Sequence, residues 1–160
     1  MIIMPTWQYS VKLYDEKKIA KAVKYDIPVS IKIMSETVRV IRGKKLEDAR
    51  RILEDVVKLK KPIPFRRYHG KIPHKHGLSN EYGWPAGRYP VKAARYLLEL
   101  LREVEANAEN KGLDKEKLVI YHIAAHKAPT LKRYMPRAFG RATAKFRRMC
   151  HVEIIVKEVD

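Results

Sequence analysis

Residues 118–159 read LVIYHIAAHKAPTLKRYMPRAFGRATAKFRRMCHVEIIVKEV, with apolar ends around a long basic middle. Residues 118–125 and 150–159 are rich in β-branched side chains, which is typical of partly buried strands. The segment between them contains no acidic residue. Packing this segment inside the protein would bury its many cations without partners, at a high cost in free energy. The stretch therefore predicts two antiparallel strands joined by a long extended β-hairpin over residues 118–159, with its tip near residues 133–141.

The basic part of this hairpin has the composition of an arm that binds a polyanion. Its expected RNA contacts are Lys127, Lys132, Arg133, Arg137, Arg141, Lys145, Arg147 and Arg148. Aromatic and apolar side chains stand among these cations at Tyr134, Met135, Phe139 and Phe146. Such side chains suit stacking on bases, whereas a solvated charge run does not need them. Because a long hairpin is not stable alone in water, we expect a polyanion to hold its shape.

The composition is that of a folded and strongly basic protein. We expect a single RNA-binding domain over residues 1–160, in which 35 Lys and Arg against 18 Asp and Glu give a formal net charge of +17. This charge and a pI near 10.0 indicate nucleic acid as the partner. Cys150 is the only cysteine, which excludes a disulfide within the chain and a thiolate zinc site. We interpret it as a small strand residue.

Neither a membrane span nor a secretory leader is expected. No apolar stretch approaches the roughly 20 residues of a spanning helix. The apolar residues 1–4 are stopped by Pro5 and are too few for a signal sequence. We therefore expect a cytoplasmic location.

The remaining pattern predicts an α+β fold, with three helices packed on a small antiparallel sheet. Residues 26–33 alternate apolar and polar side chains and predict a half-buried strand. Ser35 offers an N-cap for a short first helix, which Gly43 ends. Further helices are expected over residues 46–57 and 90–111, each with an apolar stripe at helical spacing.

Residues 58–87 form a second basic region, the basic loop, in which proline and glycine prevent long helices or strands. A loop of this length in a compact domain is usually functional or ordered by a partner, and we expect phosphates to order it. Its expected RNA contacts are Lys58, Lys60, Lys61, Arg66, Arg67, His69, Lys71, His74, Lys75 and His76, with Arg88 directly after the loop. A metal site at the three histidines is disfavoured because Lys71 and Lys75 would repel a cation.

His122 and His126 lie at strand spacing and face the same side, an arrangement that would suit a general base. We expect no acidic side chain to pair with them. The acidic residues of the chain fall mainly on the expected helices, and no glycine-rich phosphate loop is present. No enzymatic activity is therefore expected, and His126 joins the predicted RNA-binding set.

The hairpin tip reads KRYMPRAFGRA at residues 132–142, and further blocks are IRGK at 41–44, PIPFRR at 62–67, GRYPVKAA at 87–94 and HIAAHK at 122–127. Together these blocks resemble the universal large-subunit ribosomal protein L22 family, called L17 in eukaryotic numbering. The resemblance covers nearly the whole chain in order. The long basic loop is similar to the archaeal and eukaryotic branch of that family.

This resemblance implies a structural protein that binds large-subunit ribosomal RNA, supports its assembly and contacts neighbouring ribosomal proteins in cytoplasmic ribosomes. It also implies that the hairpin tip lines the nascent-peptide exit tunnel and faces the growing polypeptide. By the matching motif, the tunnel-lining residues are Arg133, Tyr134, Met135, Pro136, Arg137, Ala138, Phe139 and Gly140. No cofactor, metal, membrane contact or homo-oligomer is expected.

Two other classes of protein remain open. An architectural DNA-binding protein could insert a basic β-arm with Pro136 at its tip into a groove, but this leaves the basic loop without a role. A metal nuclease could use His74 and His76, and it predicts RNA cleavage that chelation abolishes. A comparison of the affinities for large-subunit RNA and for duplex DNA at matched salt distinguishes an RNA-binding protein from the DNA-binding alternative. Absence of RNA cleavage excludes the nuclease.

Overall fold

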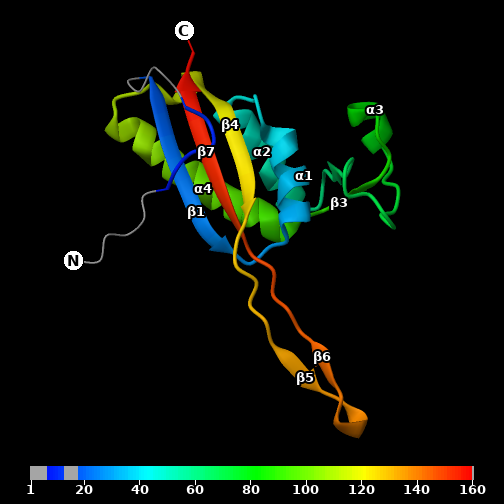
Figure 1. Cartoon of the computed structure of the whole chain (residues 1–160). Helices are drawn as coiled ribbons and strands as arrows, with labels where there is room; N and C mark the ends of the chain where they lie inside the picture. The colour runs from blue at the N-terminus through cyan, green and yellow to red at the C-terminus, as the bar shows by residue number, and fades with distance from the viewer. Residues whose placement is uncertain (1–6, 13–17, 160) are drawn as a thin grey trace, which may run out of the picture.

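The computed structural model describes residues 7–12 and 18–159, so the expected absence of a leader at residues 1–5 concerns residues outside the described part. An antiparallel sheet of three strands forms the centre of the fold (Figure 1). Its strands are β1 (Ile19–Ile27), β4 (Leu118–Lys127) and β7 (Cys150–Glu158), with β7 in the middle. The helices α1 (Ile31–Ile41), α2 (Leu46–Val57) and α4 (Val91–Asn110) cover one face of this sheet (Figure 1).

The central strand β7 is buried on both faces because a layer lies over each of them. Successive side chains of a strand point to opposite faces. Val152, Ile154 and Val156 accordingly belong to the core beneath the helices, whereas Glu153 points to the other face, where residues 7–12 cross the sheet (Figure 1). Cys150 at the start of β7 is fully buried, and burial raises the pKa of its thiol to about 11. It is the small strand residue that the sequence predicts.

The two long amphipathic helices and the strand pair confirm the sequence-based expectations. Helix α2 has the predicted bounds, and α4 begins directly after Pro90 and ends before Gly112, which has a φ of +74°. Leu53, Leu97 and Leu101 are fully buried, and α2 and α4 pack against each other. Of the described helices, none has both the length and the apolarity to cross a membrane.

The expected strand over residues 26–33 is wrong. Strand β1 ends at Ile27, and α1 begins at Ile31. Asp26 has a left-handed φ of 50°, and the Val29 N–H donates to the Ile27 carbonyl at 2.7 Å, so the chain turns here. Pro28 cannot donate a hydrogen bond to a neighbouring strand.

The expected N-cap of α1 is also wrong. Ser30 is the N-cap, and its carbonyl accepts from Ile33 and Met34. Ser35 lies inside the helix, where its hydroxyl donates to the Lys32 carbonyl.

The basic loop has more structure of its own than expected. It contains β2 (Ile63–Pro64), which pairs with β3 (Gly87–Arg88), and a fourth, short helix α3 (Leu78–Tyr82). Buried Ile63 and Phe65 attach it to the core of the body, and buried Leu78 packs α3 on the β2–β3 pair. A Cβ atom at Gly87 would lie 2.4 Å from the Leu78 side chain and 2.7 Å from the Ile63 carbonyl, so this close approach requires glycine.

Beyond the sheet, residues 128–149 form the arm, which extends away from the body (Figure 1). Near its end, β5 (Tyr134–Pro136) pairs with β6 (Ala142–Ala144), and the turn η2 (Ala138–Gly140) closes the tip. Almost every arm residue is exposed. The globular core is therefore complete without the arm.

Candidate nucleic-acid interface

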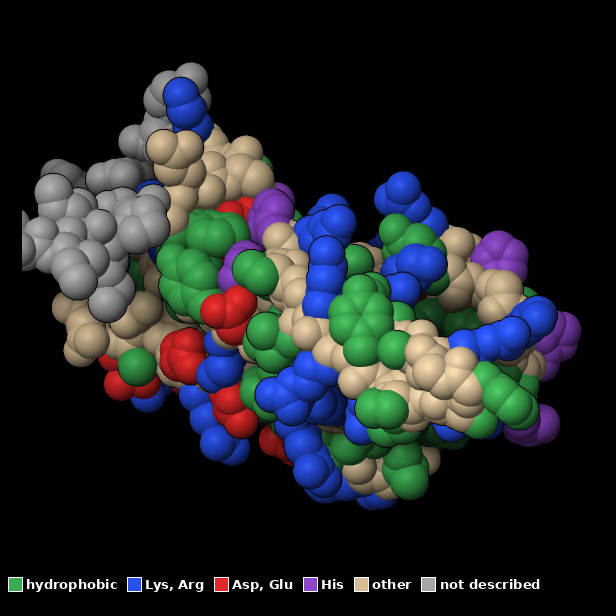
Figure 2. Space-filling view, turned by 60° about the horizontal axis from the view of Figure 1, so that its bottom comes forward, with side chains coloured by type: hydrophobic (Ala, Val, Ile, Leu, Met, Phe, Trp, Pro, Cys, Tyr) green, Lys and Arg blue, Asp and Glu red, His purple; other side chains and the backbone are tan. Residues whose placement is uncertain are grey.

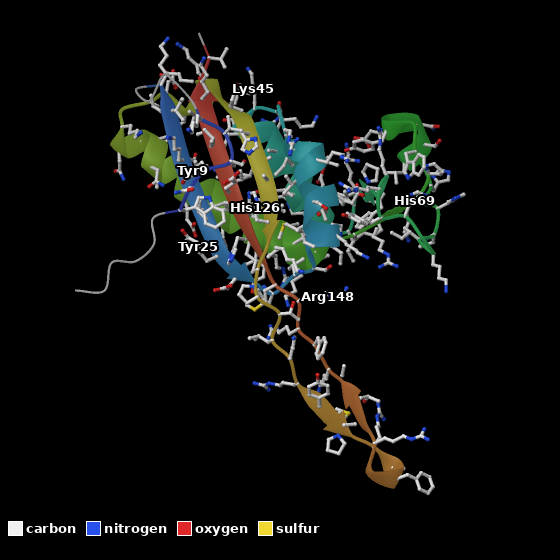
Figure 3. The ribbon with its side chains drawn as sticks, viewed as in Figure 1. Tyr9, Tyr25, Lys45, His69, His126 and Arg148 are labelled. Carbon is white, nitrogen blue, oxygen red and sulfur yellow. The ribbon has the colours of Figure 1, made fainter. Side chains whose placement is uncertain are left out.

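The cations of the arm face solvent. Of the acidic side chains in residues 7–12 and 18–159, none forms an ion pair with an arm residue. Within the arm, the Arg137 guanidinium donates a hydrogen bond to the Thr143 hydroxyl at 3.2 Å. The predicted contact residues Lys132, Arg133, Arg141, Lys145 and Arg147 are likewise exposed, and Arg148 lies at the base of the arm (Figure 3). The positive charge of the arm is thus not matched within the described chain.

Charge is segregated over the face that carries the arm (Figure 2). The acidic side chains visible in this view gather on its left. The right half, toward which the basic loop extends in Figure 1, shows Lys, Arg and His side chains without red ones. The arm and the basic loop therefore lie on the side of this view where Lys, Arg and His side chains stand among apolar and polar ones without visible acidic side chains.

Aromatic side chains form a small cluster halfway along the arm. The rings of Tyr134 and Phe146 meet edge to face with centroids 5.7 Å apart. Phe146 and Leu131 border a hollow with Arg133, Lys145 and Arg147. Exposed rings beside cations provide the two contacts that unstacked bases and their phosphates use.

The tip presents one aromatic residue to its surroundings. Phe139 is 99 % exposed and has a φ of 57°. Because this conformation is unfavourable for a bulky side chain, the turn around it must be held by its hydrogen bonds. The Arg137 N–H donates to the Arg141 carbonyl at 2.7 Å, and Gly140 has a φ of 68°.

A buried carboxylate holds one segment of the basic loop, and the sequence analysis did not expect this contact. Glu36 of α1 accepts the backbone N–H groups of Arg66, Arg67 and Tyr68 at 3.2, 2.7 and 2.9 Å. Elsewhere in the loop, the Trp84 indole donates to the Phe65 carbonyl at 2.8 Å. The protein itself therefore supplies partners for the backbone of residues 65–68 in the loop.

The loop histidines lie on the surface with the lysines around them. The ring of His69 meets Trp84 edge to face, and its Nδ1 is 2.6 Å from the Arg66 carbonyl oxygen (Figure 3). Both His74 and His76 are exposed. Within the described ranges, no group of three or more His, Cys, Asp or Glu side chains has an arrangement that could hold a metal ion.

His122 and His126 do share an acidic partner, which the sequence analysis missed. The Nε2 atoms of His122 and His126 lie 3.1 and 3.2 Å from Oε1 of Glu153, which is fully buried. The Trp7 indole and the Ser10 hydroxyl also donate to this carboxylate. Burial alone would raise the pKa of Glu153, but hydrogen bonds, led by Ser10 and Trp7, outweigh it and lower the pKa to about 2.

This cluster places His126 apart from the other predicted RNA contacts. Its Nε2 is buried against Glu153, and its ring meets Trp7 edge to face at 5.5 Å. Tyr25 and His151 also meet Trp7 edge to face, and Tyr25 lies near His126 on the outer face of the sheet (Figure 3). The cluster fixes residues 7–12 on the sheet, which is a structural role.

A second cationic site escaped the sequence analysis. Arg39, Lys44 and Tyr82 line a hollow together with the predicted contact Arg66. On the sequence, Arg39 and Lys44 look like solvated residues at the end of a helix. The pairing that brings α1 and the basic loop together, through Glu36, has no local signal.

The chain matches the family model described as ribosomal protein L22p/L17e over residues 22–157. Among its curated relatives is a protein of Staphylothermus marinus named large ribosomal subunit protein uL22, which is 69 % identical over 157 residues, covering 98 % of this chain and all of that protein. Proteins of the same name from Ignicoccus hospitalis and Aeropyrum pernix are 57 % and 58 % identical, each again covering 98 % of this chain and 100 % of the relative.

Proposed function

We propose, because this chain belongs to the ribosomal protein L22p/L17e family, that its arm and basic loop bind large-subunit ribosomal RNA and that the arm tip lines the nascent-peptide exit tunnel. The protein is a structural constituent of the large ribosomal subunit and not an enzyme, and its place is in the ribosome. Ribosomal RNA and other ribosomal proteins are its partners. Residues 1–160 act as one RNA-binding unit, present as a single copy.

The observation that carries RNA binding is the extended arm without internal charge partners. Its exposed cations find no acidic side chain in the described chain. Lys and Arg that neutralise phosphates release counterions, which yields affinity that falls steeply with salt. The phosphates of a folded RNA supply the negative charge that would neutralise the cations of this arm.

Shape then gives the binding its selectivity. Double-stranded RNA is recognised mostly by its shape and backbone. The basic loop is fixed to α1 through Glu36, and the arm leaves the sheet as a continuation of β4 and β7. A folded RNA must therefore match both elements at once, which separates this protein from a flexible polycation.

Binding measured on the full chain tests the RNA proposal. Filter binding to large-subunit ribosomal RNA and to duplex DNA is compared across salt concentrations from about 50 to 200 mM. We expect tighter binding to the RNA at every salt concentration. Equal or tighter binding to duplex DNA contradicts the proposal and favours an architectural DNA-binding protein.

Contact with the nascent polypeptide is supported by the tip geometry. The turn at Ala138–Gly140 presents the Phe139 ring outward with almost its whole surface exposed. The neighbouring tip residues Arg133, Tyr134, Met135, Pro136 and Arg137 are exposed as well. A thin tip whose outermost residue, Phe139, has an almost fully exposed ring suits the lining of a narrow passage.

A photo-reactive phenylalanine analogue at Phe139 tests this contact. In ribosomes stalled on a nascent chain, irradiation should crosslink the analogue to the nascent polypeptide. The same analogue at Tyr121, which is half exposed on β4, is the matched control and should not react with the nascent chain. Crosslinks from Phe139 to ribosomal RNA alone contradict tunnel lining but leave RNA binding intact.

A further inference from the structure

A hollow between α1 and the basic loop has the composition of a nucleotide site. It is lined by Arg39, Val40, Lys44, Pro64, Arg66 and Tyr82, and its volume is about 260 Å³. Val40 and Pro64 are buried and form the apolar inner end, whereas Arg39 and Arg66 are exposed at the rim. An aromatic wall, an apolar floor and three cations are thus combined in one small space.

The cations of the hollow are only weakly neutralised by the protein. Glu36 lies 3.9 Å from Arg39, but its oxygens are already occupied by three backbone N–H groups. Within the described ranges, no acidic side chain forms an ion pair with Lys44 or Arg66. The hollow is thus lined by three cationic residues with one carboxylate, Glu36, beside Arg39, and this excess of positive charge attracts an anion from outside.

The hollow is also held in shape without a ligand. The Lys44 carbonyl accepts from the Ile120 N–H at 2.9 Å, which ties this residue to β4. Arg66 is held at two points, because its N–H donates to Glu36 and its guanidinium donates to the Tyr82 carbonyl. Since an Arg side chain has five donors, most of the Arg66 guanidinium remains available. A site with fixed groups binds with less loss of conformational entropy.

We propose that this hollow is a preformed site for one unstacked nucleotide of the ribosomal RNA. Its phosphate lies among Arg39, Lys44 and Arg66, and its base lies against Tyr82 and the apolar floor. This inference rests on the proposed RNA binding and names a contact that is separate from the arm. Because the hollow has a volume of about 260 Å³ and one aromatic wall, it suits one base, with its phosphate at the rim, and not a longer stretch.

Photo-crosslinking of the wild-type chain is the first test. Large-subunit RNA transcribed with 4-thiouridine or 6-thioguanosine is bound to the full protein, irradiated and digested, and the adducts are mapped by mass spectrometry. We expect nucleotide adducts on the peptides that carry Lys44 or Tyr82. The free monophosphates of the same thionucleosides should crosslink there far less at equal concentration. Equal crosslinking of the free nucleotides overturns the assignment to RNA.

Affinity measurements separate stacking from charge. Tyr82→Ala should weaken binding about fivefold or more, without a change in the salt dependence, because stacking on an aromatic ring contributes no counterion release. Lys44→Gln should reduce the slope of log affinity against log salt by about 1. The controls are Tyr121→Ala on β4 and Lys115→Gln, whose ammonium already pairs with Glu109. Both controls should bind like the wild type.

The outcomes distinguish failure of this inference from failure of the proposed function. If the wild type shows no preference for the RNA, RNA binding itself is wrong. If the wild type binds the RNA but both variants match it, and adducts appear only on the arm, the hollow is not a nucleotide site. Tyr82 packs against the core, so Tyr82→Phe and thermal unfolding control for folding, and the Lys44 and crosslinking results are decisive alone.

Discussion

Within residues 7–12 and 18–159, the carboxylates of Glu36 and Glu153 are buried, and both act as acceptors for the protein's own polar groups. Burying a carboxylate is costly unless hydrogen bonds replace its hydration. Glu36 accepts hydrogen bonds from three backbone N–H groups of the basic loop. Glu153 accepts hydrogen bonds from Trp7 and Ser10 and also contacts two imidazole rings. Each carboxylate therefore helps to fix a segment on the body of the protein, in the basic loop beside the buried apolar side chains of Ile63 and Phe65. Their removal should release those segments and leave the sheet intact.

The contribution of Glu153 to stability should depend on pH. Its pKa is lowered from 4.5 to about 2. A carboxyl group whose pKa is lower in the folded state than in the unfolded state stabilises the protein at pH values above its pKa in the unfolded state. This stabilisation is lost as the pH falls toward its pKa in the folded state. The free energy of unfolding lost in Glu153→Gln should be roughly 1–3 kcal/mol near neutral pH. This difference should shrink between about pH 4.5 and 2.

Urea unfolding of the wild type and Glu153→Gln at several pH values measures this difference. Glu158→Gln, a half-buried position on the same strand, is the control. A difference between the wild type and Glu153→Gln that stays constant from pH 7 to pH 3 would show that the carboxylate is not held ionised by its partners.

Glu36→Gln should loosen the basic loop. A glutamine offers one acceptor oxygen to three N–H donors and adds donors of its own. At least one backbone N–H of Arg66, Arg67 or Tyr68 then remains buried without a partner, at a cost of roughly 1–3 kcal/mol. Hydrogen exchange of these amides should become faster, while exchange in β7 should not change. Exchange equal to that of the wild type contradicts the role of Glu36, and Glu81→Gln in α3 is the exposed control.

At the scale of elements, the arm should be dispensable for folding. In the deletion of residues 133–141, Lys132 joins Ala142. The Leu131 and Arg147 backbones pair at 2.9 Å in both directions, so Lys132 and residues 142–146 become a short connection of ordinary length between them. No residue of the deleted segment is buried. The variant should keep its helical circular dichroism and lose less than about 1 kcal/mol of stability, as exposed positions usually do.

The same deletion should affect function at the tip. The truncated protein should still enter large subunits, since the basic loop remains, but the passage of nascent peptides should be altered. Loss of helical circular dichroism would show that the core extends into the arm. The deletion of α3, residues 78–82, is a useful contrast because buried Leu78 lies in it, and it should destabilise the protein.

Elements with a single consistent period could be predicted from the sequence. The apolar stripes of α2 and α4 and the paired strands β4 and β7 have this property. Residues 27–33 carry apolar side chains at every second position, yet Met34, Val38 and Ile41 continue a helical stripe behind them. The left-handed turn at Asp26 decided between the two patterns, and such a turn is set by tertiary packing.

The site was predictable in charge but not in its contacts. The cations of the arm and loop are local in sequence, and the structure places them on the surface. The link between Glu153 and the two histidines depends on strand register, because Ala124 lies opposite Glu153 and His122 and His126 flank Ala124. A strand sequence alone does not define this register. The hollow at Tyr82 depends in the same way on contacts between distant parts of the sequence, because the Glu36 side chain of α1 binds the backbone of the basic loop.

At the scale of the whole molecule, the arm and the loop are two binding elements attached to one body. When two elements bind one RNA together, the second binds at a high effective concentration, which raises the overall affinity beyond that of either element. This gain is lost if the geometry prevents both from binding at once. The affinity for folded RNA should therefore depend on the length of the arm as well as on its charge.

A longer arm tests this dependence without the loss of any contact group. Four threonines are inserted after Thr130 and four after Arg147, one insertion in each chain of the arm and both on the body side of the pair formed by Leu131 and Arg147. An even number keeps each side chain on its original face, and the tip moves outward by about 13 Å. Affinity for folded large-subunit RNA should fall by at least about tenfold, while affinity for unstructured poly(U) should not change. Filter binding measures both, and equal losses or no loss on either RNA would show that the arm acts only as a flexible cationic tail.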